Sequence, residues 1–174
     1  TEPGWARYTV LDGTVIPTFG ISEAEIAESQ ADVTARGIQD VYQNQYPVEG
    51  ITRETFTYVF LYAYTDEAAA ADDFAGAEQR WRAEPGYSEL MFTPNPIATG
   101  DESWSVSMRH EAAGTVSTMT YVRFDHIAIG IRINGTGAPI PDVVNTLLAS
   151  QVACMQANDC AAPIPVPPEL VAIG

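Results

Sequence analysis

Lysine is absent from this 174-residue sequence, and basic residues are scarce. Eight arginines stand against 23 aspartates and glutamates, which gives a net charge of -15. A field of that sign repels nucleic acid phosphates and anionic lipid headgroups, so nucleic acid and membrane-surface binding are disfavoured. No run of about 18 apolar residues is present to span a bilayer, and we expect no membrane span. Hydrophobic residues make up 46%, which suffices for a folded core.

Cysteine is almost as scarce. The two cysteines, Cys154 and Cys160, lie six positions apart near the end of the chain. An even count at close spacing predicts a local disulfide in an oxidising compartment, with two unpaired thiols at a helix end as the alternative. The sequence also lacks an initiating methionine, so we expect a mature or trimmed form, secreted or attached to the cell envelope through a segment upstream of Thr1.

The length fits one domain. We expect a domain over residues 1–160 and an extended, proline-rich tail over residues 161–174. The turn signal Asp12-Gly13 predicts a small hairpin within residues 5–16. The capping-box pattern of Ser22 to Glu25 predicts a helix that is bent or split at Gly37 and ends before Pro47.

Two further helices are indicated by their apolar spacing. Residues 68–83 carry a narrow stripe made of Ala70, Phe74, Ala77 and Trp81, with Thr65 as the expected cap. Asp142 opens a last amphipathic helix.

Strands are indicated by β-branched and aromatic residues in alternation. Residues 51–64 form the longest such run, with one aromatic face, and three shorter runs follow at 103–109, 115–124 and 127–133. The connections between the last three are short, which requires antiparallel pairing. The fold class predicted is therefore α+β, an antiparallel sheet of about five strands with two or three helices packed on one face.

Catalytic signatures are missing. The two histidines, His110 and His126, each lie at a predicted strand end beside an acidic residue, without a nucleophile nearby in the sequence, and we interpret them as turn residues. We predict no catalytic residues.

Metal and cofactor signatures are also weak. The acidic residues Asp66, Glu67, Asp72 and Asp73 are interpreted as the solvated start of a helix, and Asp101 with Glu102 as turn chemistry. Asn134-Gly135-Thr136 matches a glycosylation sequon and is interpreted as a loop that closes the last strand. We predict no metal and no cofactor.

One surface stands out from strand parity. If Phe56, Trp104, Val122 and the isoleucines of residues 127–133 face the helices, the opposite, helix-free face carries Arg109, Arg123, Arg132 and Tyr121, together with Arg53. Arginines that converge in this way bind anionic groups, so we predict a ligand-binding patch for an anion. The alternative is that each arginine pairs with a nearby acid on a solvated face.

The region from Ile51 to Ala157 also carries a resemblance. Thr65 to Ala83, with its acidic start, alanine-rich run and terminal Trp81-Arg82, resembles the first sheet-packing helix of small bacterial extracytoplasmic lipoprotein and sensor-like domains. The best-known domain of this kind is the extracellular sensor domain of mycobacterial serine/threonine kinases. The order of elements in this region, a strand, a helix, an antiparallel meander and a closing helix, is similar to the order in that family. The resemblance implies an extracytoplasmic, ligand-sensing role without catalytic residues.

Two classes of function follow. The first is a non-enzymatic binding or sensor-like module for a small molecule or a cell-envelope protein. The second is a hydrolase or isomerase that uses a buried carboxylate. The lack of a histidine, serine or cysteine constellation favours binding over catalysis.

Overall fold

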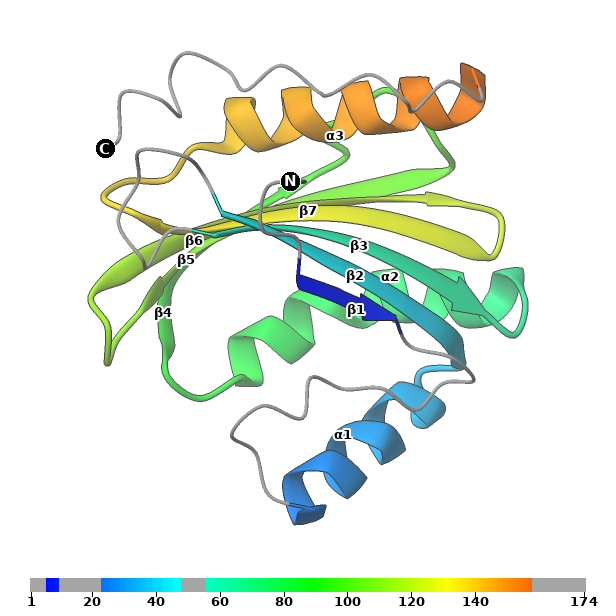
Figure 1. Cartoon of the computed structure of the whole chain (residues 1–174), viewed down its shortest axis with the longest axis horizontal. Helices are drawn as coiled ribbons and strands as arrows, with labels where there is room; N and C mark the ends of the chain where they lie inside the picture. The colour runs from blue at the N-terminus through cyan, green and yellow to red at the C-terminus, as the bar shows by residue number, and fades with distance from the viewer. Residues whose placement is uncertain (1–5, 10–22, 48–55, 158–174) are drawn as a thin grey trace.

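A computed structural model describes residues 6–9, 23–47 and 56–157 (Figure 1). The described residues form seven strands and three helices, in the chain order β1 (Ala6–Thr9), α1 (Glu23–Ala35), β2 (Ile38–Pro47), β3 (Phe56–Tyr64), α2 (Glu67–Ala83), β4 (Tyr87–Pro94), β5 (Glu102–His110), β6 (Thr115–Phe124), β7 (Ile127–Thr136) and α3 (Pro141–Ala157).

The strands form one antiparallel sheet in the order β1-β2-β3-β7-β6-β5-β4. Strands β5, β6 and β7 are the predicted meander, and β7 pairs with β3 at the centre of the sheet. The register places Tyr121 opposite Gly130 on one side and opposite Trp104 on the other. The aromatic row of β3 therefore lies on the same face of the sheet as Tyr121.

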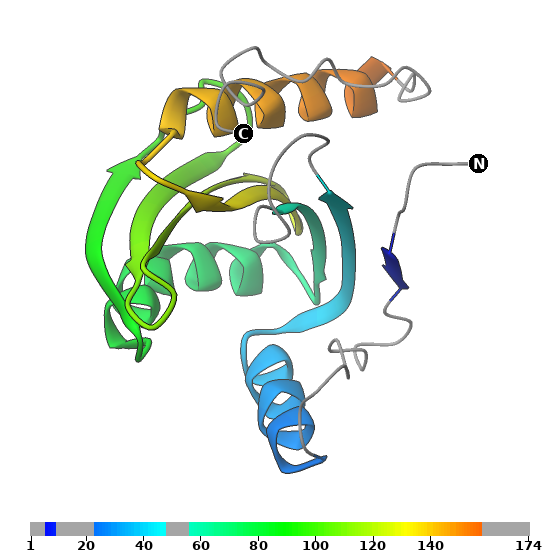
Figure 2. The same cartoon turned by 60° about the vertical axis from the view of Figure 1, so that its left-hand side comes forward.

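Each face of the sheet has its own hydrophobic core. Helices α1 and α2 lie on one side and α3 on the other, as both views show (Figures 1 and 2). Along β7 the isoleucines at 129, 131 and 133 pack with α3, whereas Ala128 belongs to the core beneath α2. Alternation along a strand sends successive side chains to opposite faces, so one strand supplies both cores.

The α+β class and the antiparallel sheet are confirmed, with seven strands where about five were expected. Helices α1 and α2 share one face of the sheet, which agrees with the smaller of the expected numbers, two helices on one face. Helix α3 instead covers the opposite face of β5, β6 and β7. The helix-free face that was expected there does not exist. Each face carries apolar side chains, and each needs a cover.

The helix expected from Ser22 to Pro47 is shorter than predicted. Helix α1 ends at Ala35, and Gly37 adopts φ +70°, a left-handed conformation that glycine tolerates and that ends helices. A side chain at Gly37 would also meet Ala69, since a Cβ there would lie 2.7 Å from the Ala69 Cβ. The residues after Gly37 form β2, so the helical prediction for them is wrong.

Strand β4 was not predicted. Its pairing with β5 shifts register between Ser88 and Met91, and Glu89 has φ +52°, so the irregular segment lacks a clean alternation of polar and apolar residues. Residues 51–55, the hairpin turn at Asp12-Gly13 and the tail 161–174 lie outside the described residues.

The apolar stripe of α2 is confirmed, because Ala70, Phe74 and Ala77 are buried. The helix cap is Asp66, which accepts a hydrogen bond from the Ala69 backbone N–H at 2.8 Å, so the prediction of Thr65 as the cap is wrong by one residue.

Candidate functional site

A cavity of about 380 Å³ lies beneath α2, where the end of α1 meets the sheet. Side chains from α2, β3, β5 and β6 line it, and the segment at the end of α1 adds Asp32 and Arg36. This volume falls in the range of small-molecule sites, roughly 300–1,000 Å³. The lining is of two kinds, an aromatic wall and a charged cluster.

The aromatic wall consists of Tyr62, Phe74, Trp81, Trp104 and Tyr121. The Trp104 and Tyr121 ring centroids lie 4.7 Å apart, and Trp104 meets Phe74 edge-on at 6.2 Å. The Tyr62 and Tyr121 rings lie 5.8 Å apart. Aromatic contacts of this kind stabilise beyond the area they bury, so the wall is held in one arrangement without a ligand.

Gly130 gives Tyr121 its place in this wall. The two residues are cross-strand partners, and a Cβ at Gly130 would lie 2.1 Å from Tyr121 Cε1. The ring therefore rests on the backbone of β7, in space that only a glycine leaves open.

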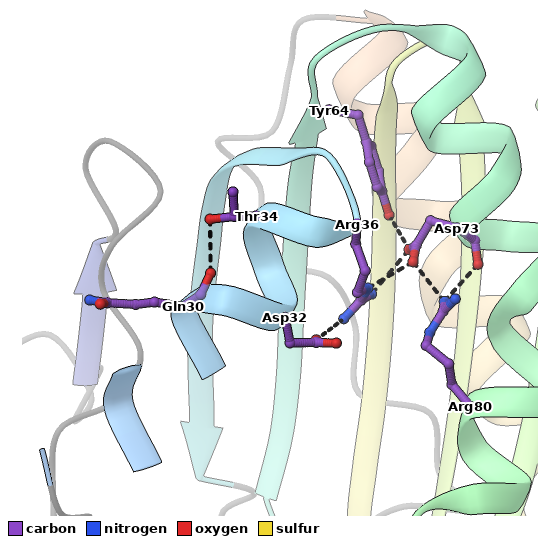
Figure 3. A network of polar contacts seen from close by, with 7 residues as sticks. All are labelled: Gln30, Asp32, Thr34, Arg36, Tyr64, Asp73 and Arg80. Carbon is purple, nitrogen blue, oxygen red and sulfur yellow. Dashed lines mark hydrogen bonds and ion pairs between the residues drawn. The ribbon is translucent and has the colours of Figure 1, made fainter. Parts of the chain in front are cut away.

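The charged cluster centres on Asp73, whose side chain is 4% exposed (Figure 3). The Tyr64 hydroxyl donates to Asp73 Oδ2 at 2.7 Å, and Arg36 donates from Nε to Oδ1 at 2.7 Å and from Nη2 to Oδ2 at 3.0 Å. Arg80 adds its Nη2, 2.7 Å from Oδ1 and 2.6 Å from the Asp73 backbone oxygen. We name Arg36, Tyr64, Asp73 and Arg80 the Asp73 cluster.

Arg36 joins α1 to α2 through this cluster. Its third nitrogen, Nη1, lies 3.3 Å from Asp32 on α1, so each of its nitrogens has a carboxylate partner. Burial alone lowers the pKa of Arg36, but the hydrogen bond to Asp73 and the charge of Asp73 outweigh burial, and the pKa is raised. Arg36 therefore stays positively charged and links α1 to α2.

The pKa of Tyr64 is raised, first by burial and then by the charge of Asp73 and the hydrogen bond to it. Burial likewise raises the pKa of Tyr62 and of Tyr121. The pKa of Arg80 is lowered by burial, which the charge of Asp73 offsets in part, yet a guanidinium stays protonated at physiological pH. The cavity is thus lined by neutral tyrosines, two arginines and three acidic side chains, those of Asp32, Asp73 and Glu84.

Two groups that line the cavity have donors to spare. Trp104 Nε1 is buried without a hydrogen-bond partner. Arg80 uses Nη2 for Asp73, and no partner for its Nε or Nη1 lies among the described residues. Its Nη1 lies over Gly76, where a Cβ would approach to 2.6 Å. A buried donor without a partner costs about 1–3 kcal/mol, which applies to the Trp104 N–H, whereas the Arg80 side chain is 36% exposed and its spare nitrogens can be solvated until a ligand binds.

The predicted arginine patch is not assembled. Arg109 shares a face with the serines of β5 on the α3 side of the sheet, and it pairs with Glu89 at 3.0 Å. Arg123, Arg132 and Tyr121 lie on the α2 side. The prediction of one shared surface is wrong, because the register places the Ile129 face and the Trp104 face on opposite sides. Arg53 lies outside the described residues.

Arg123 and Arg132 also have local partners, although the buried Nε of Arg123 makes no hydrogen bond to the described residues. Arg123 is 7% exposed, lies 3.6 to 3.8 Å from the carboxylates of Glu67, Asp101 and Glu102, and donates to the Asp125 backbone oxygen at 2.9 Å. Arg132 donates to Asn134 Oδ1 at 2.5 Å. Anion binding by any single one of the arginines stays a prediction.

The remaining candidates lie apart from the cavity. His126 is exposed, with Nδ1 3.1 Å from Asp125, and His110 packs beside the Tyr87 ring. Asn134-Gly135-Thr136 lies within β7, so its interpretation as a loop is wrong. In the described ranges, no group of three histidine, cysteine, aspartate or glutamate side chains is placed to hold a metal ion. Cys160 and the side chain of Cys154 lie outside the described residues.

Asp73 is buried, so its interpretation as part of a solvated helix start with Asp66, Glu67 and Asp72 is wrong. Asp73 lies three residues after Ala70 and four before Ala77, on the buried stripe of α2. A carboxylate at core spacing needs a buried partner, and this signal was present in the sequence.

Comparison with known proteins adds little. No protein-family model and no curated protein matches the chain. One solved structure, the extracellular domain of PknH from Mycobacterium tuberculosis, is similar over 73% of this chain and 69% of that one, at 10% identity and a TM-score of 0.49. It is a domain of the kind that the sequence resembles, and the likeness is too weak to say anything of ligand or activity. None of the helices in the described part is long and apolar enough to cross a membrane.

Proposed function

We propose that this protein is a binding module that holds a small organic molecule in the cavity beneath α2. The observation that carries the proposal is the preformed aromatic wall of the cavity, with Arg80 beside it. An apolar cavity with a few convergent polar groups is the usual form of a small-molecule site.

The cavity is a better candidate than the arginines of the sheet. Arg109 and Arg123 lie on different faces of the sheet, and each has a carboxylate neighbour. A ligand there would have to displace existing ion pairs. The cavity offers open volume, and Arg80 there has two nitrogens without partners among the described residues.

Catalysis by a buried carboxylate has weaker support. Asp73 is the buried carboxylate among the described residues, and both of its oxygens accept hydrogen bonds from arginine or tyrosine. A general base needs a free lone pair within reach of a substrate proton. Asp73 is instead placed to hold Arg36 and Arg80.

A screen of ring-containing compounds by thermal shift tests the proposal, with hits confirmed by calorimetry. Ala83 lines the cavity and Ala75 lies exposed on the same helix outside it, so Ala83→Phe and Ala75→Phe form a matched pair. We expect hits to lose binding to Ala83→Phe and to keep it with Ala75→Phe. Equal binding to both variants, or no hit at all, would refute the proposal.

We also infer that the module works outside the cytoplasm, alone or with a cell-envelope protein. The spacing of Cys154 and Cys160 supports this inference, since a local disulfide forms in oxidising compartments. Intact mass after alkylation, with and without reduction, tests it on protein isolated from its native source. Two alkylated thiols without reduction would contradict the inference.

A further inference from the structure

The geometry points to a monocarboxylate that carries an aromatic ring as the ligand of this cavity, with its carboxylate on Arg80 and its ring against the aromatic wall. This inference rests on the proposed function and adds the chemical class of the ligand. It follows from three features of the lining, which are the spare donors, the aromatic surfaces and the acids at the rim.

The spare donors favour an anionic acceptor. Arg80 is held in place by Asp73, yet its Nε and Nη1 have no partner among the described residues. These two nitrogens point to different sides of the guanidinium, so a ligand carboxylate would accept from one of them, and such a charge-assisted hydrogen bond is stronger than a neutral one. Arg36, by contrast, has carboxylates on all three nitrogens and offers nothing further.

Trp104 supplies an aromatic surface beside Arg80. Its indole N–H is buried without a partner in the described part of the chain, and the ring contacts Tyr121 and Phe74. Trp104 and Arg80 line the same cavity. The cavity therefore combines a cationic donor with an aromatic surface, which favours an organic acid over an amine.

The rest of the aromatic wall favours a ligand that carries an aromatic ring. Trp81, Tyr62 and Tyr121 present aromatic surfaces to the cavity. The Tyr62 and Tyr121 rings lie 5.8 Å apart. Such ring surfaces stack on aromatic ligands.

The rim limits the ligand to one carboxylate. Asp32 and Glu84 line the cavity and both are exposed. Asp32 Oδ2 lies 3.3 Å from Arg36 Nη1, and Glu84 has no ion pair among the described residues, so both acids bring negative charge to the rim. A second carboxylate on the ligand would meet these like charges, which disfavours a dicarboxylate.

Isothermal titration calorimetry with four probes tests the class. The probes are 2-naphthoate, its neutral isostere 2-naphthamide, its saturated analogue decahydro-2-naphthoate, and the cation 2-naphthylmethylammonium. We expect 2-naphthoate to bind at least tenfold more tightly than each of the other three. The comparison uses wild-type protein and needs no variant to fold.

Two variants place the carboxylate. Arg80→Gln removes the proposed partner, and Arg82→Gln is the control, because Arg82 lies on the same helix but pairs with the exposed Glu78 at 2.6 Å. We expect Arg80→Gln to weaken 2-naphthoate binding about 10- to 100-fold, the loss expected for hydrogen bonds to a charged group, without changing the affinity for 2-naphthamide. Arg82→Gln should change neither affinity.

The outcomes separate the two proposals. If 2-naphthamide, the saturated acid or the cation binds as tightly as 2-naphthoate, or if Arg80→Gln leaves 2-naphthoate binding intact, the ligand class is wrong and the binding function stands. If none of the four probes binds at millimolar concentration, the inferred class is overturned. The screen with Ala83→Phe then decides the binding function separately.

Discussion

Replacing Asp73 by asparagine tests the structural centre of the site. The substitution keeps the shape of the side chain but removes its charge, and it turns one acceptor into a donor that faces arginine donors. Arg36 and Arg80 then lose their shared counter-ion, while the Tyr64 hydroxyl can still donate to the amide oxygen. The perturbation is thus electrostatic and leaves no cavity.

The expected loss follows from burial. Breaking a buried ion pair costs about 3–5 kcal/mol, because it leaves a charge without a partner. The side chains of Arg36 and Arg80 are 27% and 36% exposed, so water can solvate part of their charge, and we expect the lower end, about 3 kcal/mol. At roughly 2–4 °C per kcal/mol for a chain of this size, the melting temperature should fall by about 6–12 °C.

Urea unfolding followed by far-UV circular dichroism measures this loss. Glu78→Gln is the matched control on the same helix, since the pair of Glu78 with Arg82 is exposed on both sides and should be worth less than about 0.5 kcal/mol. If Asp73→Asn unfolds within about 0.5 kcal/mol of the wild type, the Asp73 cluster does not stabilise the fold, and the reasoning fails.

Three further predictions concern the packing around the cavity and under α3. Three tyrosines have raised pKa values when folded, so above pH about 10 the folded state retains protons that the unfolded state has lost, and the free energy of unfolding falls as pH rises. Absorbance at 295 nm should show these tyrosines ionising only with unfolding; their ionisation near pH 10 in folded protein would contradict this. Gly130→Ala should displace the Tyr121 ring and cost about 1–3 kcal/mol in urea unfolding, whereas Gly137→Ala, with open space around it, should be near neutral. Asn145→Ala removes the acceptor of the Thr120 hydroxyl at 2.7 Å and should cost about 1 kcal/mol by the same assay; no loss would mean that this bond does not help to dock α3.

Strand alternation predicted which residues share a face within one strand but not which faces match between strands. Trp104 and the isoleucine at 129 were placed on one face by assumption, and the register of β5, β6 and β7 separates them. The register between strands depends on turn geometry and on the packing of both faces, so the residue pattern of a single strand does not determine it. The arginine patch failed for this reason.

The cavity itself lay beyond sequence reasoning because its parts come from distant segments. Arg36 and Asp73 are 37 positions apart, and Tyr121 takes its place only because Gly130 is its cross-strand partner. The apolar stripe of α2 was predictable from spacing alone, since a helix repeats every 3.6 residues wherever it packs. Closer attention to the charged residue on that stripe would have predicted a buried ion pair.

A crystal structure of the protein with 2-naphthoate bound tests the central claim most directly. The account predicts the naphthyl ring in the cavity beneath α2, in contact with Trp104, and the carboxylate within hydrogen-bond distance of Arg80 Nε or Nη1. An empty cavity at saturating 2-naphthoate, or the ligand bound elsewhere on the molecule, would contradict it.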